Sequence, residues 1–396
     1  MRSIESQSET ATKLERIAWI SAKNSTKTFA QLMHHVNVDS LQECYKLLDG
    51  SKAVGIDTVT KVAYGKQLGD NLQMLVSRMK QMAYRPAPVR EVRLPKETLG
   101  EYRSLGISNF EDKIVQKQFQ RILESIYEPI FKDCSYGFRQ NRSAHDAVRA
   151  LYKHLYRGNV RMVIDVDLAS YFDMINHKMM EEFLKLKIKD KRFLRYINRM
   201  FKAGILTKGE LKITDEGVPQ GNILSPVLAN IFAHYVIDMW FENTVKSHCR
   251  GEVELYRYCD DMVILCQCEK DAHRIKIALA KRLDKFKLQV NENKTKLIRF
   301  STWTKDRSSF DFLGFTFYWG KSQKGHKILK LRTSGKRMRS KLKKVHRWAK
   351  FMRHKADTVT IWKCFCRKLQ GHIRYYGVTH NMKQLNILAL RFFLWF

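Results

Sequence analysis

The hydrophobic and polar positions of this chain change their period several times. Apolar residues recur at helical spacing over 11–49 and over 112–130, which predicts helices in both ranges. Residues 88–108 alternate apolar and polar side chains around a turn at Glu97–Gly100, which predicts a basic hairpin. A β-branched run opens residues 160–177, and a Pro/Gly turn leads into a helix within 216–241. One side of that helix collects Leu224, Leu228, Ile231 and Tyr235.

The second half of the chain continues with shorter elements. Two strand-like runs flank a turn within 255–266, a helix follows near 269–287, and further strand-like pieces lie at 296–300 and 310–319. Strands and helices alternate without a strict βαβ repeat, so we expect an α+β fold. From about Lys330 the pattern is helical and basic, after a Gly/Lys-rich linker at 320–327. We therefore expect a helical N-terminal extension (1–60), a mixed central domain (61–325) and a basic helical domain (326–396).

Composition indicates a globular protein. The 396 residues are 44% hydrophobic and include six prolines, enough for two or three domains with real cores. The N-terminus is polar where a signal peptide would be apolar, and no window approaches the roughly 18 apolar residues of a membrane span. We expect a soluble cytoplasmic protein. The C-x-C pairs Cys266/Cys268 and Cys364/Cys366 are interpreted as small buried side chains rather than zinc ligands.

The positive charge of the chain points to a polyanionic partner. There are 73 Lys and Arg against 39 Asp and Glu, a formal net charge of +34. Residues 321–374 hold 19 of the basic residues and a single acid, Asp357, interleaved with aromatic side chains such as Trp348 and Trp362. Counterion release and base stacking make nucleic acid the natural partner, and an anionic membrane is the weaker alternative.

Four carboxylates are candidates for metal chemistry. Asp260 and Asp261 lie side by side at the turn of the 255–266 hairpin, and period two places Asp165 and Asp167 on one face of the strand near 162. Half-buried like charges persist only when a cation offsets them. Turn aspartates are common, so the pair alone favours a structural role. Combined with a second Asp-bearing strand and a basic aromatic domain, it predicts two Mg²⁺ ions, with Mn²⁺ as the alternative ion.

The Tyr-Cys-Asp-Asp stretch at 258–261 resembles the Y-x-D-D box of reverse transcriptases. Further blocks resemble those of the bacterial group II intron enzymes, in the same order along the chain. They begin with LPKETLGEYRSLGIS (94–108), DCSYGFRQNRSAHDAV (133–148), DVDLASYFDMINH (165–177) and GVPQGNILSPVLANIF (217–232). They continue with LQVNENKTKLIRF (288–300), FDFLGFTF (310–317) and the thumb-like KLQGHIRYYGV (368–378). The resemblance implies a right-hand polymerase fold, with fingers and palm over 61–325 and a thumb over 326–396.

The resemblance also implies a role for each matching residue. Asp167, Asp260 and Asp261 match the catalytic metal ligands, with Asp165 second to Asp167, and Phe172 matches the gate that excludes a ribose 2′-OH. Other matches bind the incoming nucleotide: Lys96, Arg103, Gln220, Gly221 and Lys294. The primer grip matches Leu313, Gly314 and Phe315. The basic domain implies contacts to nucleic acid through Arg337, Arg339, Lys341, Lys343, Lys344, Arg347, His372 and Arg374.

The implied activity is RNA-templated addition of dNTPs to a primer, with an RNA–DNA duplex bound along the basic domain. The compact chain and its Y-C-D-D box look most like the defence-associated reverse transcriptases of type 2, which act against phage with a companion noncoding RNA as template. The alternative is a group II intron maturase, which binds its own intron RNA to aid splicing and mobility. A truncated intron protein would end in the same way, and the protein partners stay open.

Overall fold

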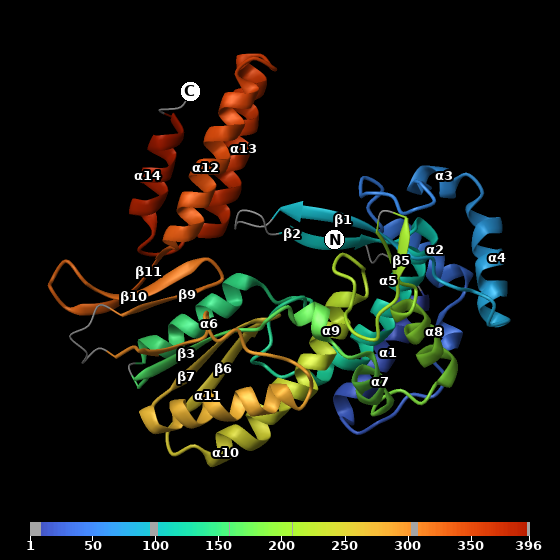
Figure 1. Cartoon of the computed structure of the whole chain (residues 1–396), viewed down its shortest axis with the longest axis horizontal. Coiled ribbons are helices and arrows are strands. Elements are labelled where there is room, and N and C mark those ends of the chain that lie inside the picture. The colour runs from blue at the N-terminus through green and yellow to red at the C-terminus, as the bar shows by residue number, and fades with distance from the viewer. Residues whose placement is uncertain (1–8, 96–101, 158, 208, 302–307, 394–396) are drawn as a thin grey trace, which may run out of the picture. The chain divides into compact units, whose positions relative to one another are not determined.

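The computed structural model describes residues 9–95, 102–157, 159–207, 209–301 and 308–393. Figure 1 shows its helices and strands. The chain divides into two compact units, each assembled from separate stretches of sequence. The first unit contains Met1–Arg142, Leu168–Ser247 and Leu279–Val290, and the second contains Ser143–Asp167, His248–Ala278 and Asn291–Phe396. The division into three consecutive domains stays a prediction.

Helix α5 (Phe110–Tyr127) is the centre of the first unit. Ile114, Phe119 and Ile122 recur on its inner face and are fully buried. Helices α1 (Glu9–Lys23), α2 (Val38–Leu47) and α9 (Ser225–Ala233) pack against α5. The helices predicted over 11–49 and 112–130 are thus confirmed, and burial of their apolar faces stabilises them more than local propensity does.

The N-terminal helical region is interrupted between α1 and α2. A single 3₁₀ turn covers Met33–His35, and Asn37 then caps α2 by accepting a hydrogen bond from the Ser40 N–H at 3.0 Å. Side-chain oxygens at this position satisfy backbone donors that a helix leaves unpaired, so they favour a new helix start. Helices α3 (Lys61–Gly65) and α4 (Leu68–Lys80) follow.

The predicted basic hairpin is formed by β1 (Val89–Pro95) and β2 (Tyr102–Ile107), which pair antiparallel. Strand β1 also pairs with β4 (Ile205–Thr207), and β4 pairs with β5 (Glu210–Lys212), which gives the strand order β2-β1-β4-β5 in the described residues. The turn predicted at Glu97–Gly100 lies outside the described residues, and so does Lys96.

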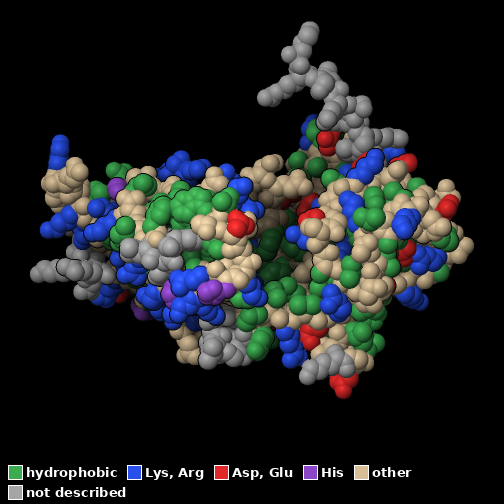
Figure 2. Space-filling view, turned by 90° about the horizontal axis from the view of Figure 1, so that it is seen from above, with side chains coloured by type: hydrophobic (Ala, Val, Ile, Leu, Met, Phe, Trp, Pro, Cys, Tyr) green, Lys and Arg blue, Asp and Glu red, His purple; other side chains and the backbone are tan. Residues whose placement is uncertain are grey.

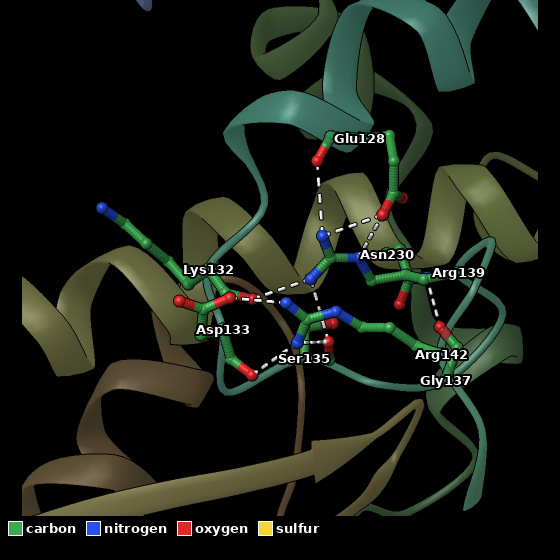
Figure 3. Close-up of polar contacts among 8 residues, drawn as sticks. All are labelled: Glu128, Lys132, Asp133, Ser135, Gly137, Arg139, Arg142 and Asn230. Atoms are coloured by element: carbon green, nitrogen blue, oxygen red, sulfur yellow. Dashed lines mark hydrogen bonds and ion pairs between the residues drawn. The ribbon is translucent and has the colours of Figure 1, made fainter. Parts of the chain in front are cut away.

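Two arginines fix the loop that follows α5, as Figure 3 shows. The buried Arg139 pairs with Glu128 at 2.8 Å and donates to the carbonyls of Lys132 and Ser135, both at 2.9 Å. Arg142 donates to the Asp133 carbonyl at 2.8 Å. Each guanidinium satisfies several carbonyls at once, so the loop backbone needs no regular secondary structure.

The rest of the first unit is mostly helical. The 3₁₀ turn Tyr171–Met174 leads to α7 (His177–Lys185) and α8 (Lys191–Phe201), and π-helical segments at His234–Asp238 and Phe241–Val245 extend α9 toward α10 (Lys246–His248). Asp190 caps α8 with one carboxylate oxygen, and its other oxygen accepts the N–H groups of Leu32 and Met33 at 2.7 and 3.0 Å. One buried carboxylate therefore ties α8 to the N-terminal region.

The second unit is built on an antiparallel sheet of four described strands. Its order is β6-β7-β3-β8, with β6 (Val253–Tyr258), β7 (Asp261–Cys266), β3 (Met162–Asp167) and β8 (Lys296–Arg299). Helix α6 (Ala144–Tyr156) packs on β6, and α11 (Glu269–Asp284) follows β7. The inner strands β3 and β7 are almost continuously buried, so their exceptions, Asp165, Asp167 and Asp261, stand out.

Three further strands correct two of the sequence expectations. The piece predicted at 310–319 is two strands, β9 (Ser309–Phe312) and β10 (Phe315–Lys321), joined by a tight turn. The stretch 320–327, predicted as a linker, instead contains the end of β10, the turn 322–326 and the first residue of β11 (Lys327–Thr333), which pairs antiparallel with β10. Helix therefore begins at Gly335 and not near Lys330. The Gly and Lys residues predicted a flexible linker, but they occur as readily in a hairpin turn.

Helices α12 (Gly335–Met352), α13 (Thr358–Tyr376) and α14 (Met382–Phe393) run side by side at the C-terminal end of this unit (Figure 1). Their buried contacts are Met338, Leu342, Val345, Phe365 and Leu388. The eight cysteines are free; Cys266 is buried as expected, but Cys366 is exposed. None of the described helices combines the length and apolar character needed to cross a membrane.

Candidate active site

Asp167 and Asp261 are direct partners across the central strands of the second unit. Strands β3 and β7 pair Asp167 with Asp261 and Asp165 with Val263. The Cβ atoms of cross-strand partners lie about 4.5–5.5 Å apart. The two carboxylates therefore lie on the same face of the sheet, at the end where β3 finishes and β7 begins. The convergence of distant aspartates expected from the sequence is present for this pair.

The hairpin turn that carries Asp260 has a constrained backbone. Tyr258 pairs with Asp261, which leaves Cys259 and Asp260 as the two loop residues. Cys259 has φ +61° and is buried, whereas Asp260 has a negative φ. A positive φ at the first loop position only is the pattern of a type II′ turn, where glycine is usual. Below it, the fully buried Arg257 donates to the Cys259 carbonyl at 3.1 Å and stabilises the turn.

Burial and neighbouring carboxylates raise the pKa of two members of the cluster, Asp261 and Asp165. Burial, and then the charges of Asp165 and Asp260, raise the pKa of Asp261 to about 7. Burial likewise raises the pKa of Asp165 to about 6, while Lys296 acts in the opposite direction. Clustered carboxylates with raised pKa values are typical of a site that receives a cation.

Lys294 contacts Asp167. Its Nζ lies 3.3 Å from Asp167 Oδ2, and the two side chains are 66% and 44% exposed. Such an exposed pair contributes little stability, so the lysine can leave the carboxylate at low cost. The Asp167 backbone is fixed more firmly: its N–H donates to Thr295 Oγ1 at 3.3 Å and its carbonyl accepts from the Asn291 N–H at 2.8 Å. The predicted nucleotide-binding role of Lys294 stays a prediction.

The carboxylates of Asp167, Asp260 and Asp261 have the donor type that a divalent ion prefers, but their side chains are not already arranged around one ion position. Among the described residues no three His, Cys, Asp or Glu side chains are already placed to hold one ion. The donors available are carboxylate oxygens, which Mg²⁺ prefers, and their mutual repulsion is what a divalent ion would relieve. Asp167, Asp260 and Asp261 therefore fit such an ion by charge and donor type.

The predicted primer grip is the turn between β9 and β10. Leu313 and Gly314 are its two loop residues, with φ +49° and +82°, the pattern of a type I′ turn. The Leu313 N–H donates to the Asp261 carboxylate, which lowers the pKa of that group against the effect of burial. A Cβ on Gly314 would lie 2.6 Å from Tyr376 Oη, so only glycine fits here. The turn thus contacts the carboxylate cluster directly.

The C-terminal end of α13 holds this turn in place. Tyr375 donates to the Leu313 carbonyl at 3.0 Å, and its ring stacks on Phe315 with centroids 5.6 Å apart. His145 of α6 hydrogen-bonds the Tyr375 carbonyl at 2.7 Å. Sequence reasoning did not assign roles to Tyr375, His145, Arg257 or Thr295. The tyrosine pair in KLQGHIRYYGV was a visible signal, whereas the other contacts depend on the tertiary fold.

The other predicted nucleotide-binding residues belong to the first unit. Phe172 is half-buried, and its carbonyl accepts the Val218 N–H at 2.8 Å. Gln220 donates to Asp173 at 3.4 Å, and its carbonyl accepts the Gly106 N–H of β2 at 2.7 Å.

Gly221 and Arg103 are the other predicted nucleotide-binding residues of this unit. Gly221 has φ +99°, and a Cβ there would lie 3.1 Å from the Gly106 carbonyl. Arg103 is exposed on β2. Phe172, Gln220 and the β2 strand are therefore linked through backbone contacts within this unit.

Most of the predicted nucleic-acid contacts are exposed on α12 and α13, including Arg337, Arg339, Lys343, Lys344, Arg347 and Arg374. Lys341 is half-buried, and burial lowers its pKa. His372 does not fit its predicted role. It is 6% exposed, its ring lies 4.5 Å from that of Tyr376, and burial lowers its pKa to about 4. A neutral, buried imidazole packs the helix pair and is not available to a phosphate.

Comparison with known proteins identifies the family of the chain. Residues 94–317 match the family model described as reverse transcriptase (RNA-dependent DNA polymerase). The group II intron-encoded protein LtrA of Lactococcus lactis is 34% identical over 222 residues, which cover 56% of this chain and 37% of LtrA. Protein YkfC of Escherichia coli is 33% identical over 280 residues, which cover 63% of this chain and 73% of YkfC. A putative COX1/OXI3 intron 2 protein of Saccharomyces cerevisiae is 34% identical over 189 residues, 46% of this chain and 22% of that protein.

The chain belongs to the reverse transcriptase family, because the family model covers more than half of it. With the mixed helices and sheets described above, this confirms the α+β right-hand polymerase fold expected from the sequence. The matched part spans little more than a third of LtrA.

Proposed function

We propose that this protein is an RNA-templated DNA polymerase that extends a primer with dNTPs. The observation that carries the proposal is the pairing of Asp167 with Asp261 across β3 and β7, beside the Asp260 turn. Membership of the reverse transcriptase family supports it. The clustered carboxylates favour a divalent cation, and in phosphoryl transfer such a cation would offset the negative charge on the phosphate oxygens.

Asp167, Asp260 and Asp261 are the proposed ligands of two Mg²⁺ ions, with Asp165 as a supporting charge. When bound, such a pair stabilises the attacking and leaving oxygens of an in-line displacement. The chain's own contribution is positioning. The Thr295 and Asn291 contacts hold the Asp167 backbone, and the Leu313 N–H orients the Asp261 carboxylate.

The substrate contacts are proposed from the family match. Arg103 and Lys96 bind the triphosphate, and the Gln220–Gly221 turn binds the nucleotide. Lys294, which contacts Asp167, is a further nucleotide-binding residue. Phe172 excludes a 2′-OH by contact with the sugar. Leu313, Gly314 and Phe315 position the primer end, where the glycine allows a close backbone approach.

The RNA–DNA duplex is proposed to lie along the exposed cations of α12 and α13. These side chains would contact phosphates rather than base edges, so binding would depend on duplex shape and on salt concentration. Lys and Arg side chains are spread over the face drawn in Figure 2, with few Asp and Glu between them. A polyanion is the natural counterpart of such a surface.

The biological setting has two candidates. The first is synthesis of cDNA from a companion noncoding RNA in antiphage defence in the cytoplasm, which the Y-C-D-D box favours. The second is a group II intron maturase and reverse transcriptase, which the similarity to LtrA and to the yeast intron protein favours. Sequencing the RNA that copurifies with the full chain separates them: one abundant structured RNA supports defence, and intron RNA supports the maturase.

Primer extension tests the polymerase itself. The full chain is incubated with a DNA primer on an RNA template, dNTPs and Mg²⁺, beside Asp261→Asn and the control Asp284→Asn. We expect extension by the unaltered chain and by the control, whose exposed carboxylate lies at the end of α11, and none by Asp261→Asn. Absence of extension by the unaltered chain on every primed template, with intact RNA binding, would leave only the maturase function.

A further inference from the structure

A cleft lies within the first unit, and none of the described residues that line it is assigned above to polymerisation. It has a volume of about 1350 Å³ and is bordered by α7, α8, β5 and the segment 85–88. This exceeds the roughly 300–1,000 Å³ of small-molecule sites, and the cleft is partly open to solvent, so a polymeric ligand fits it better than a metabolite.

Basic side chains dominate the polar lining. They are Arg85, Lys178, Arg195, Arg199, Lys202 and Lys287. The acidic lining residues are Glu181, Glu182 and Asp215. Two of these acids are already engaged, because Lys185 lies 2.8 Å from Glu181 and 3.1 Å from Glu182. Lys287 is also engaged, because its Nζ lies 3.4 Å from Glu216. The other basic lining residues still outnumber Asp215, so the charge available to a ligand is positive.

Three arginines of this cleft repel one another. Burial lowers the pKa of Arg199, and the positive charges of Arg85 and Arg195 lower it further. The Arg199 guanidinium donates hydrogen bonds to the backbone carbonyls of Met82 and Tyr84, both at 2.8 Å. Arg85 and Arg195 are exposed, and neither forms an ion pair within the described part of the chain. Two exposed arginines without an ion-pair partner among the described residues favour an external anion.

The walls of the cleft are fixed before any ligand binds. His177 hydrogen-bonds the Gly217 carbonyl at 2.6 Å and stacks on Phe201 with centroids 4.6 Å apart. Asn176 caps α7, and Asp190 caps α8. Binding therefore orders only the tips of the long cations, which keeps its entropic cost low.

The lining also discriminates between forms of nucleic acid. Among the described residues, no Phe, Tyr or Trp lines the cleft, and the aromatic ring that does, His177, is buried. Single strands bind mainly by stacking bases on aromatic side chains, which this cleft does not offer. Spaced guanidinium and ammonium groups instead match the phosphates of a regular helix.

We propose that this cleft binds the phosphate backbone of a double-helical segment of folded RNA. It is a second RNA site, additional to the primer–template site, and it anchors a structured RNA to the first unit. Binding there requires neither dNTPs nor the carboxylate cluster, so it can be measured separately from polymerisation.

The test compares two double charge reversals in the full chain. Arg85→Glu with Arg195→Glu alters the cleft, whereas Lys189→Glu with Lys191→Glu changes the net charge equally at exposed positions outside the lining. Binding of a fluorescent RNA hairpin is titrated at several salt concentrations without dNTPs. Thermal melting checks that both variants fold.

We expect the cleft variant to bind the hairpin at least 10-fold more weakly and the salt slope to fall by about 2, since two phosphate contacts are lost. The hairpin affinity of the control variant should change less than about threefold. For both variants, the affinity for single-stranded RNA and the extension of a short primer–template should also change less than about threefold. Equal losses in both variants, or unchanged hairpin binding, would overturn the proposal. Loss of binding to vesicles with anionic headgroups, but not to the hairpin, would overturn it in favour of a membrane site.

Discussion

Tyr375 donates its hydroxyl hydrogen to the carbonyl of Leu313 at 3.0 Å, which joins helix α13 to the turn beside Asp261. The neighbouring Ser334 N–H donates to the Gly314 carbonyl at 2.9 Å, so the turn is held at two consecutive carbonyls. The proposed primer grip is thus supported by Ser334, which precedes α12, and by Tyr375, 62 positions further along the chain than Leu313. This contact is a route by which the thumb-like helices can affect the position of the primer end.

Replacing Tyr375 by Phe should therefore impair extension more than folding. Loss of one neutral hydrogen bond costs about 1 kcal/mol of unfolding free energy, while a loosened turn reduces the primer affinity of the proposed polymerase. Tyr152→Phe is the matched control, because Tyr152 donates to the Leu329 carbonyl at 3.2 Å in the same unit. Primer KM and thermal melting are measured for both. Equal effects of the two variants on KM would contradict a positioning role for Tyr375.

The carboxylate cluster predicts how stability depends on pH in the absence of metal. Folding raises the pKa of Asp261 to about 7 and that of Asp165 to about 6, each from an ordinary value of 3.8. The folded state then binds these protons more tightly than the unfolded chain, so their contribution to stability is complete below pH 4 and is lost as pH rises toward 7.

This dependence can be measured by chemical denaturation between pH 4.5 and 8 in EDTA. The unaltered chain should lose stability across this range relative to Asp165→Asn with Asp261→Asn, in which these two groups no longer titrate. Adding Mg²⁺ at pH 8 should raise the melting temperature of the unaltered chain and leave the double variant unchanged. An identical response of both proteins to Mg²⁺ would place the ion elsewhere.

The sequence predicted the parts of this site that depend on local pattern. Period-two alternation was enough to put Asp165 and Asp167 on one face of β3, and the Y-C-D-D stretch was enough to find the β6–β7 hairpin. The pairing of Asp167 with Asp261 could not be derived from either pattern alone, because register between distant strands depends on tertiary packing. Here the family resemblance supplied what the spacing of residues could not.

The wrong predictions concern turns and one buried side chain, which local sequence pattern does not determine. Residues 320–327 were expected to form a linker and 310–319 a single strand, because glycine and lysine mark hairpin turns and linkers alike. Positive φ at Leu313, a residue that rarely adopts it, is not visible in the sequence. His372 was grouped with the exposed cations, since only the packed α13 shows that its ring faces Tyr376.

Phe172 provides a test of sugar discrimination. Its ring lies edge-on to Tyr171 with centroids 5.7 Å apart, and its backbone carbonyl is bound to Val218, so the side chain can be shortened without freeing the backbone. Phe172→Ala should raise the ratio of rNTP to dNTP incorporation by roughly 10- to 200-fold, the range of a removed steric contact. Competition between the two nucleotides in single-turnover extension measures this ratio, and an unchanged ratio would assign the gate to another side chain.

Arg139 should be far more important to stability than Arg142, although both arginines fix the same loop (Figure 3). The Arg139 side chain is 5% exposed and bonds Glu128 together with two carbonyls, whereas the Asp133 partner of Arg142 is 97% exposed. Removal of one member of a buried pair costs about 3–5 kcal/mol, and removal of an exposed pair costs about 1 kcal/mol or less.

Arg139→Ala should consequently lower the unfolding free energy several times more than Arg142→Ala in urea denaturation. Arg139→Lys separates charge from geometry, because lysine keeps the charge but cannot reach Glu128 and both carbonyls with one planar group. It should therefore recover only part of the loss. Equal destabilisation by Arg139→Ala and Arg142→Ala would mean that the loop is held by its buried Asn230–Gly137 bond, at 2.7 Å, rather than by the Arg139 guanidinium.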